Sequence, residues 1–336
     1  MNDALPMPVG KPIHLYIRLG TVLLAVLILT TLALMWWWDF EPRPFDVVQT
    51  SRSAAEQHQQ AVVEGTTSTR TLIAVTEAMM DKRGGYLSND MLTPAVFMDN
   101  IPNWEFGVLV QVRDFAKALR NDFSRSQTQS VEDADLAQAE PLFSSPNDRW
   151  LLPSSESQYR QGIGYLEAYL TRLSAQNQSN TRFYPRADNL ADWLALVEKR
   201  LGSLSQRLSA SAGQAVLDTD PNDGEAAAND GLVMVRTPWL QIDDVFYEAR
   251  GSTWALLHLL KAVEVDFDGV LRDKNALVSL RQIIRELEET QVPLGSPIVL
   301  NGSPFGFFAN HSLVMANYIS RANAAIIDLR KLLERG

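Results

Sequence analysis

Residues 19–38 read LGTVLLAVLILTTLALMWWW, a run of 20 residues that contains no charged side chain. As an α-helix this run would be ~30 Å long, which is the thickness of the hydrocarbon core of a bilayer. It ends in Trp36, Trp37 and Trp38, and tryptophans are enriched at membrane interfaces. A cleavable signal peptide would have a shorter apolar region that ends in small residues. The run therefore predicts an uncleaved transmembrane helix at 19–38.

The basic residues around this helix bear on its orientation. Lys11 and Arg18 precede the apolar run, whereas Arg43 and Arg52 follow it, so the number of basic residues alone does not set the topology. A first span that follows a short basic tail usually inserts with that tail in the cytoplasm. We therefore expect a cytoplasmic tail at 1–18 and a main body, 39–336, on the other side of the membrane.

The composition excludes several classes of function. The chain has 336 residues, no Cys, four His and a formal net charge of −10. Without Cys there is no thiol nucleophile, disulfide, Cys-ligated zinc or iron–sulfur cluster, and the acidic balance argues against binding to nucleic acid. The complete signatures of the common hydrolases and nucleotide-binding proteins are also missing. We therefore predict no metal, no cofactor and no nucleic acid partner.

Beyond residue 45, apolar residues recur at intervals of four and three, which is the spacing of a buried helical seam. Alternation typical of strands is confined to 231–235 and 298–300, and each stretch is too short for a sheet. The predicted fold class is all-α, an N-terminal transmembrane helix followed by a helical bundle. The two clearest seams are Leu190, Leu194, Val197, Leu201, Leu204 and Leu208, and Met315, Ile319, Ala322, Ile326, Leu329 and Leu333.

A long helix is expected from about Asp46 to Lys82, after a stiff spacer with Pro42 and Pro44. Its interior seam is unusually polar, and such a seam packs less well than one made of leucines. A helix of this length needs burial to be stable in water, so we expect part of its surface to be covered by another chain. The polar positions of the seam are Gln59, Thr66, Thr69 and Thr76.

Loops and glycines divide the rest of the body. Flexible loops are expected near 121–157 and 212–231, the second of which is acidic and fits a calcium-binding loop only in part. The sequence GIGYLE at 162–167 begins like a dinucleotide-binding fingerprint, but Glu167 ends it and no strand precedes it. We instead expect Gly162 and Gly164 to allow close helix packing.

The segment 83–107 combines Gly, Pro, polar and aromatic residues and is the first candidate site. Carboxylate and amide groups around a Trp would suit a sugar or a peptide. The structural alternative, which we favour, is that Asn100 and Pro102 begin a helix and Trp104 packs it onto the core. The polar group consists of Asp99, Asn100, Asn103 and Glu105.

Asn310 and His311 form the second candidate site, at the expected start of the last helix. His311 could act as a base, but a cap or a loop contact is the commoner role at such a position. No catalytic residue is assigned in either site. The candidates for binding a ligand or a partner are therefore Asp99, Asn100, Asn103, Trp104, Glu105, Asn310 and His311.

Three stretches carry a resemblance to a known family: GGYLSND at 84–90, DNIPNWEFG at 99–107 and NHSLVMANY at 310–318. They resemble a family of Gram-negative inner-membrane proteins with a single N-terminal span, known as a domain of unknown function. The similarity covers nearly the whole chain. It implies an anchored protein of the bacterial cell envelope, with the body in the periplasm, and it supplies no catalytic residues.

Two classes of function follow from these observations. The favoured one is a scaffold or interaction protein without catalytic activity, bound to the lipid bilayer through its anchor and to a second copy or another envelope protein through its helices. The alternative is an enzyme that acts on envelope glycan or peptide through carboxylates near Trp104 or through His311.

Overall fold

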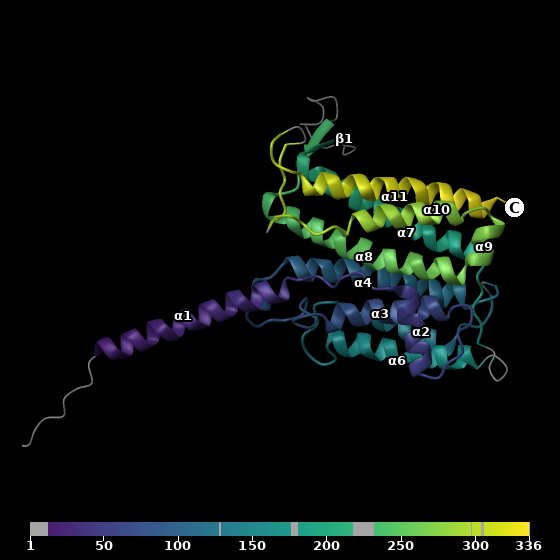
Figure 1. Ribbon diagram of the computed structural model, residues 1–336, viewed down its shortest axis with the longest axis horizontal. Coiled ribbons are helices and arrows are strands. Elements are labelled where there is room, and N and C mark those ends of the chain that lie inside the picture. The colour runs from purple at the N-terminus through teal and green to yellow at the C-terminus, as the bar shows by residue number, and fades with distance from the viewer. Residues whose placement is uncertain are drawn as a thin grey trace, which may run out of the picture.

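The computed structural model describes residues 13–335 except 128, 176–180, 218–231, 297 and 304–305. An apolar helix, α1 (Ile13–Trp38), projects from a helical body (Figure 1). Residues 15–38 of α1 are long and apolar enough to cross a membrane, and their most apolar window has no buried residue. Of the tail expected at 1–18, residues 1–12 lie outside the described residues, and residues 13–18 belong to α1.

The all-α fold class is confirmed by the described part of the body. Its helices are α2 (Val47–Gln57), α3 (Thr66–Asp81), α4 (Asn100–Ala118), α5 (Ala134–Phe143), α6 (Ser155–Ser174), α7 (Ala187–Ser209), α8 (Ile242–Asp266), α9 (Asp268–Asp273), α10 (Leu277–Glu289) and α11 (His311–Glu334). The prediction that the stretch at 231–235 is too short for a sheet is wrong, because it supplies β2 (Leu232–Val235), which pairs antiparallel with β1 (Gln214–Leu217) in a two-stranded ribbon.

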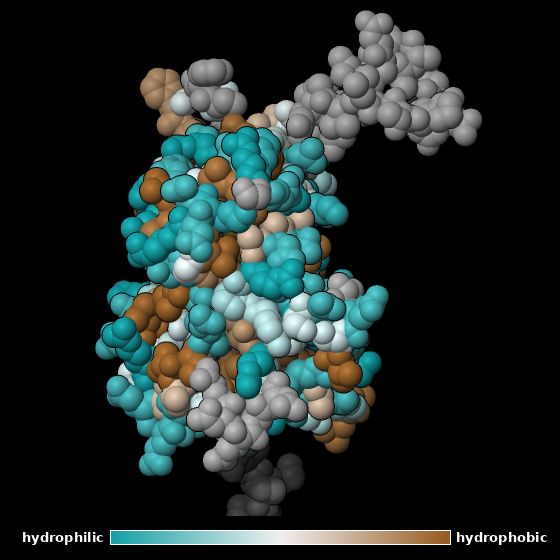
Figure 2. Space-filling view, turned by 90° about the vertical axis from the view of Figure 1, so that its right-hand side faces the viewer, coloured by the Kyte–Doolittle hydropathy of each residue, from teal (hydrophilic) through white to brown (hydrophobic). Residues whose placement is uncertain are grey.

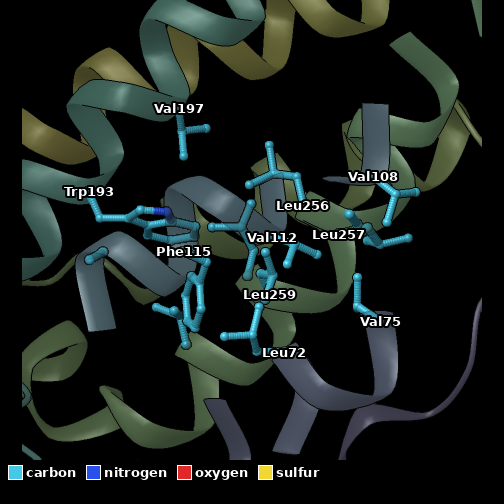
Figure 3. Close-up of a cluster of buried hydrophobic side chains, with 14 of the residues drawn as sticks. Leu72, Val75, Val108, Val112, Phe115, Trp193, Val197, Leu256, Leu257 and Leu259 are labelled. Atoms are coloured by element: carbon cyan, nitrogen blue, oxygen red, sulfur yellow. The ribbon is translucent and has the colours of Figure 1, made fainter. Parts of the chain in front are cut away.

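The long helices stack from α11 and α10 through α8 and α4 to α3 and α6 (Figure 1). Both predicted apolar seams are buried, one along α7 and the other along α11, and these two helices pack against each other. Figure 3 shows the centre of the core, where Phe115 of α4 meets Trp193 of α7 with ring centroids 5.1 Å apart. Leu256 of α8 and Leu72 of α3 complete the contact between the layers.

Two glycines allow the backbones of α4 and α8 to approach each other closely. A Cβ at Gly107 of α4 would lie 2.0 Å from the backbone oxygen of Glu248, and one at Gly251 of α8 would lie 2.0 Å from that of Trp104. Because neither residue has a Cβ, each glycine leaves room for the backbone of the other helix. The expected close approach in α6 is confirmed for Gly162, which packs on the ring of Phe143, but it is wrong for Gly164, which faces open space.

The single long helix predicted at 46–82 is wrong, because the chain breaks between α2 and α3. Gln59 and Gly65 both adopt positive φ values there, which an α-helix does not accommodate. Within this segment α3 is largely buried in the body, and the expected cover of part of the segment by another chain stays a prediction. The hydroxyls of Thr69 and Thr76 donate to carbonyl oxygens of the preceding helical turn, so they can be buried without another partner.

The loop expected at 121–157 contains a helix, α5. Asp133 caps this helix by accepting hydrogen bonds from the backbone N–H groups of Asp135 and Leu136. Arg172 of α6 pairs with Asp133 at 2.7 Å and with Asp135 at 2.5 Å, which holds the start of α5 in place. Of the loop expected at 212–231, residues 214–217 form β1 and residues 218–231 lie outside the described residues.

Candidate functional site: the junction of α1 with the helical body

The segment that joins α1 to α2, residues 39–46, lies along α8, and we call it the strap. Glu41 in the strap accepts a 2.5 Å hydrogen bond from Nε of Arg250, a buried residue of α8. Burial raises the pKa of Glu41, and the guanidinium of Arg250 opposes that shift. Arg250 also donates to the backbone oxygens of Thr290 and Val292. This one side chain therefore connects the strap, α8 and the end of α10.

A second contact fixes the far end of the strap. The ring of Phe45 stacks on the imidazole of His258 with centroids 4.1 Å apart, and the N–H of Phe45 donates to Nε2 of His258 at 3.0 Å. Nε2 must therefore be the unprotonated nitrogen, and Nδ1–H donates to the backbone oxygen of Trp254 at 2.7 Å. Burial lowers the pKa of His258 from its usual 6.5 to about 4.

This neutral histidine predicts that the stability of the body depends on pH. The unfolded chain takes up a proton on His258 near pH 6.5, whereas the folded chain does so only near pH 4. The contribution is thus complete above pH 6.5 and is lost progressively as the pH falls from 6.5 to 4, by at most about 3 kcal/mol. Asp266, whose pKa is raised by burial to about 6, acts in the opposite sense.

The variant His258→Gln separates the two effects, because it keeps Asp266 and removes the titrating ring. We expect urea unfolding of the wild-type chain to lose more stability between pH 6.5 and 4.5 than unfolding of the variant does. Equal pH dependence of the two proteins would show that burial does not hold His258 neutral in the folded chain.

The loop after α3 closes over the end of α1. The guanidinium of Arg83 lies 4.2 Å from the ring centroid of Trp37 and 5.1 Å from that of Phe40. A Cβ at Gly84 would come within 2.8 Å of the ring of Trp38. The positive φ of Gly84 and this lack of space both require glycine at the turn. The end of α1 is therefore packed against the body before the strap begins.

Glu105, one of the predicted site residues, holds this loop in place through hydrogen bonds. Its carboxylate accepts hydrogen bonds from the backbone N–H groups of Leu87 and Ser88, both at 2.8 Å, and from the hydroxyl of Ser88 at 2.5 Å. Lys82 pairs with the same carboxylate. Burial raises the pKa of Glu105, and Lys82 counteracts the shift. Glu105 is fully buried, so in this structure it fastens a loop and does not face solvent.

The remaining residues of the first candidate site lie at the start of α4, as the structural alternative predicted. Asp99 caps the helix by accepting from the N–H of Asn100, and Trp104 is buried in the core, 5.2 Å from Trp254. Asn103 donates to the carboxylate of Asp244 at 2.8 Å and so links the start of α4 to the start of α8. Their role in binding a ligand or partner stays a prediction.

The second candidate site lies at the start of α11. Asn310 caps the helix by accepting from the N–H of Leu313, and Nδ1 of His311 accepts from the N–H of Leu300 at 3.0 Å. Partial burial lowers the pKa of His311. His311 lines a cavity of about 230 Å³ together with Phe246, Arg250 and Tyr318. The residues of the first site do not line this cavity, although Arg250 connects it to the strap.

A wider cavity, of about 970 Å³, lies between the strap and α3. Its lining mixes acids with bases, among them Glu77 and Asp81 from α3 and Arg43 from the strap. In the described part of the chain, no group of three or more His, Asp and Glu residues is placed to hold a metal ion. Sequence reasoning missed the strap contacts altogether, because the partners in each pair are more than 200 residues apart.

Comparison with curated proteins finds no match, and comparison with solved structures finds none either. A protein family does match, over residues 12–336, and it is described as an uncharacterized protein conserved in bacteria, DUF2333. The matched range includes α1, the strap and every helix of the body. The chain belongs to this bacterial family.

Proposed function

We propose that the chain is a single-span protein of the bacterial inner membrane whose helical body lies in the periplasm and acts, without catalysis, as an interaction module of the cell envelope. The observation that carries this proposal is the strap. A chain that only needed to be kept near the membrane could end its anchor in a flexible linker. Here Glu41 and Phe45 fasten the connection to Arg250 and His258 of the central helix.

Such a connection gives the body a fixed orientation relative to the anchor. Fixed orientation matters for a partner in the same membrane, because both proteins then present defined faces to each other in two dimensions. It adds little for an enzyme that meets a diffusing substrate. The geometry of the predicted site residues supports the same choice, since Glu105 is buried under its loop and the ring of His311 accepts a hydrogen bond from the backbone N–H of Leu300.

The surface proposed for the partner is the exposed face of α2. The segment 46–82 is expected to pair with another chain, and α2 is the helix of that segment that the structure leaves accessible. Ser53 and Gln57 of α2 are exposed, and so is Gln59 just after it, whereas Thr66 and Ser68 are buried in α3. The proposed partner is another envelope protein, and capture of a second copy of the chain would identify the interaction as self-association.

Because the native chain has no Cys, one cysteine at Ser53, Gln57 or Gln59 can test both the side of the membrane and the partner. We expect a membrane-impermeant maleimide to label all three in spheroplasts, and a bifunctional reagent to trap a protein at one or more of them. A cysteine at Thr69, which is fully buried, is the control and should stay unlabelled.

The side of the membrane and the interaction surface would each be contradicted by a different result. Labelling of the three exposed positions only after the inner membrane is permeabilised would place the body in the cytoplasm. Labelling in spheroplasts without any cross-linked species at the three positions would overturn the interaction surface on α2.

A further inference from the structure

The end of the body from which α1 emerges has apolar loop tips. In the loop between α3 and α4, Leu92 and Phe97 are exposed, and in the loop between α5 and α6, Trp150, Leu151 and Leu152 are exposed. These two loops touch each other, because the hydroxyl of Tyr86 donates to the backbone oxygen of Asn147 at 3.1 Å. The first loop also packs on the end of α1, since Trp38 contacts the small cluster around Leu87 and Ala95.

Two more loops reach the same end. Trp239 and Leu240, just before α8, have exposed fractions of 78% and 76%, and Phe307 and Phe308, just before α11, have 108% and 73%. The start of α8 is joined to that of α4 by Asn103 and Asp244. The start of α11 lies beside α8 through Phe246 and His311. Figure 1 shows the starts of α4, α8 and α11 at the end of the body that faces α1.

The opposite end differs in its residue types. Among the described residues there, the exposed large apolar side chains are valines, including Val131 and Val278. Figure 2 looks at this end and shows hydrophilic surface interrupted by separate apolar residues. Exposed Trp, Phe and Leu side chains are thus gathered on one end, and single exposed valines need no special explanation.

We propose that these four loop tips insert into the interface of the bilayer that α1 spans and thereby dock the body on the membrane. Trp and Phe are the side chains that settle at the level of the lipid headgroups, and Leu adds apolar area below them. The loop between α3 and α4 packs on the end of α1, where Arg83 lies over Trp37 and Trp38 contacts the cluster around Leu87. Because α1 and the strap already hold them beside the bilayer, weak insertion of each loop suffices for docking.

This inference rests on the part of the proposed function that places α1 in the membrane, and it is independent of any partner. The test uses the full-length chain at one copy per nanodisc, in phosphatidylethanolamine and phosphatidylglycerol with a nitroxide-labelled lipid as quencher. Single cysteines at Leu151, Leu240 and Phe307 would carry an environment-sensitive fluorophore. Cysteines at Val131 and Val278 are the matched exposed controls, and one at Leu27 reports on α1.

We expect the lipid quencher to reduce the fluorescence at the three loop positions at least about threefold more than at Val131 and Val278, with a blue-shifted emission. Quenching at Leu27 without quenching at the loops would overturn the docking proposal and leave the span intact, which would favour a protein occupant for these tips. Absence of quenching at Leu27 would overturn the span itself and, with it, the docking.

Discussion

Replacing Gly107 or Gly251 by alanine should lower the free energy of unfolding of the body by about 3 kcal/mol. In each case the new methyl group would lie 2.0 Å from a backbone oxygen of the facing helix, and backbone cannot move aside as a flexible side chain can. The clash can be relieved only by separating α4 from α8. These two helices carry Trp104 and Trp254 at the centre of the core, so separation also loosens the packing around both rings.

The control for this prediction is Gly164→Ala in α6. A Cβ at Gly164 meets nothing within 4 Å, so the substitution should be neutral or should stabilise the helix by up to about 1 kcal/mol. Urea unfolding of the three variants, followed by tryptophan fluorescence, measures the difference. If Gly251→Ala unfolded at the same urea concentration as Gly164→Ala, the close crossing of α4 and α8 would be contradicted.

Removing the guanidinium of Arg250 should have an effect of similar size, and it should also free the strap. In Arg250→Met, the buried carboxylate of Glu41 loses its partner, and breaking a buried ion pair from one side costs about 3 to 5 kcal/mol. The backbone oxygens of Thr290 and Val292 lose their donor in the same variant. Glu41 can recover hydration only if the strap moves away from α8.

Lys261→Met is the matched control on the same helix. Lys261 pairs with Glu288 at 2.6 Å, but both side chains are substantially exposed, and such pairs contribute about 1 kcal/mol or less. We therefore expect the urea midpoint of Lys261→Met to stay close to that of the wild type. Equal loss of stability in Lys261→Met and Arg250→Met would show that the pair between Glu41 and Arg250 has no special role.

The sequence predicts the parts of this fold that depend on local pattern. The seams of α7 and α11 are readable because each buried residue follows the last by one helical turn, and the start of α4 is readable from Asn100 and Pro102. The prediction of one helix over 46–82 fails at the break between α2 and α3, where Gln59 and Gly65 adopt positive φ values. The polar seam does not by itself require another chain, because threonine hydroxyls bonded within their own helix can be buried.

The junction of α1 with the body could not be predicted in the same way. Glu41 and Arg250 are 209 positions apart, and Phe45 and His258 are 213 apart, so no periodicity in either segment signals the contact. Arg250 and His258 are both buried in α8, and a buried charged or titratable side chain needs a partner. That requirement indicates that some partner exists, but only the fold shows that the strap supplies it.

The most direct test of a rigid junction is the distribution of distances between α1 and the body. Nitroxide labels on cysteines at Leu32 of α1 and Lys199 of α7, both exposed, can be measured by double electron–electron resonance in nanodiscs. We predict one narrow distance distribution for the otherwise native chain and a broad one for the same pair in Arg250→Met. A distribution as broad in the native chain as in Arg250→Met would mean that the strap is a flexible tether, and would contradict the account.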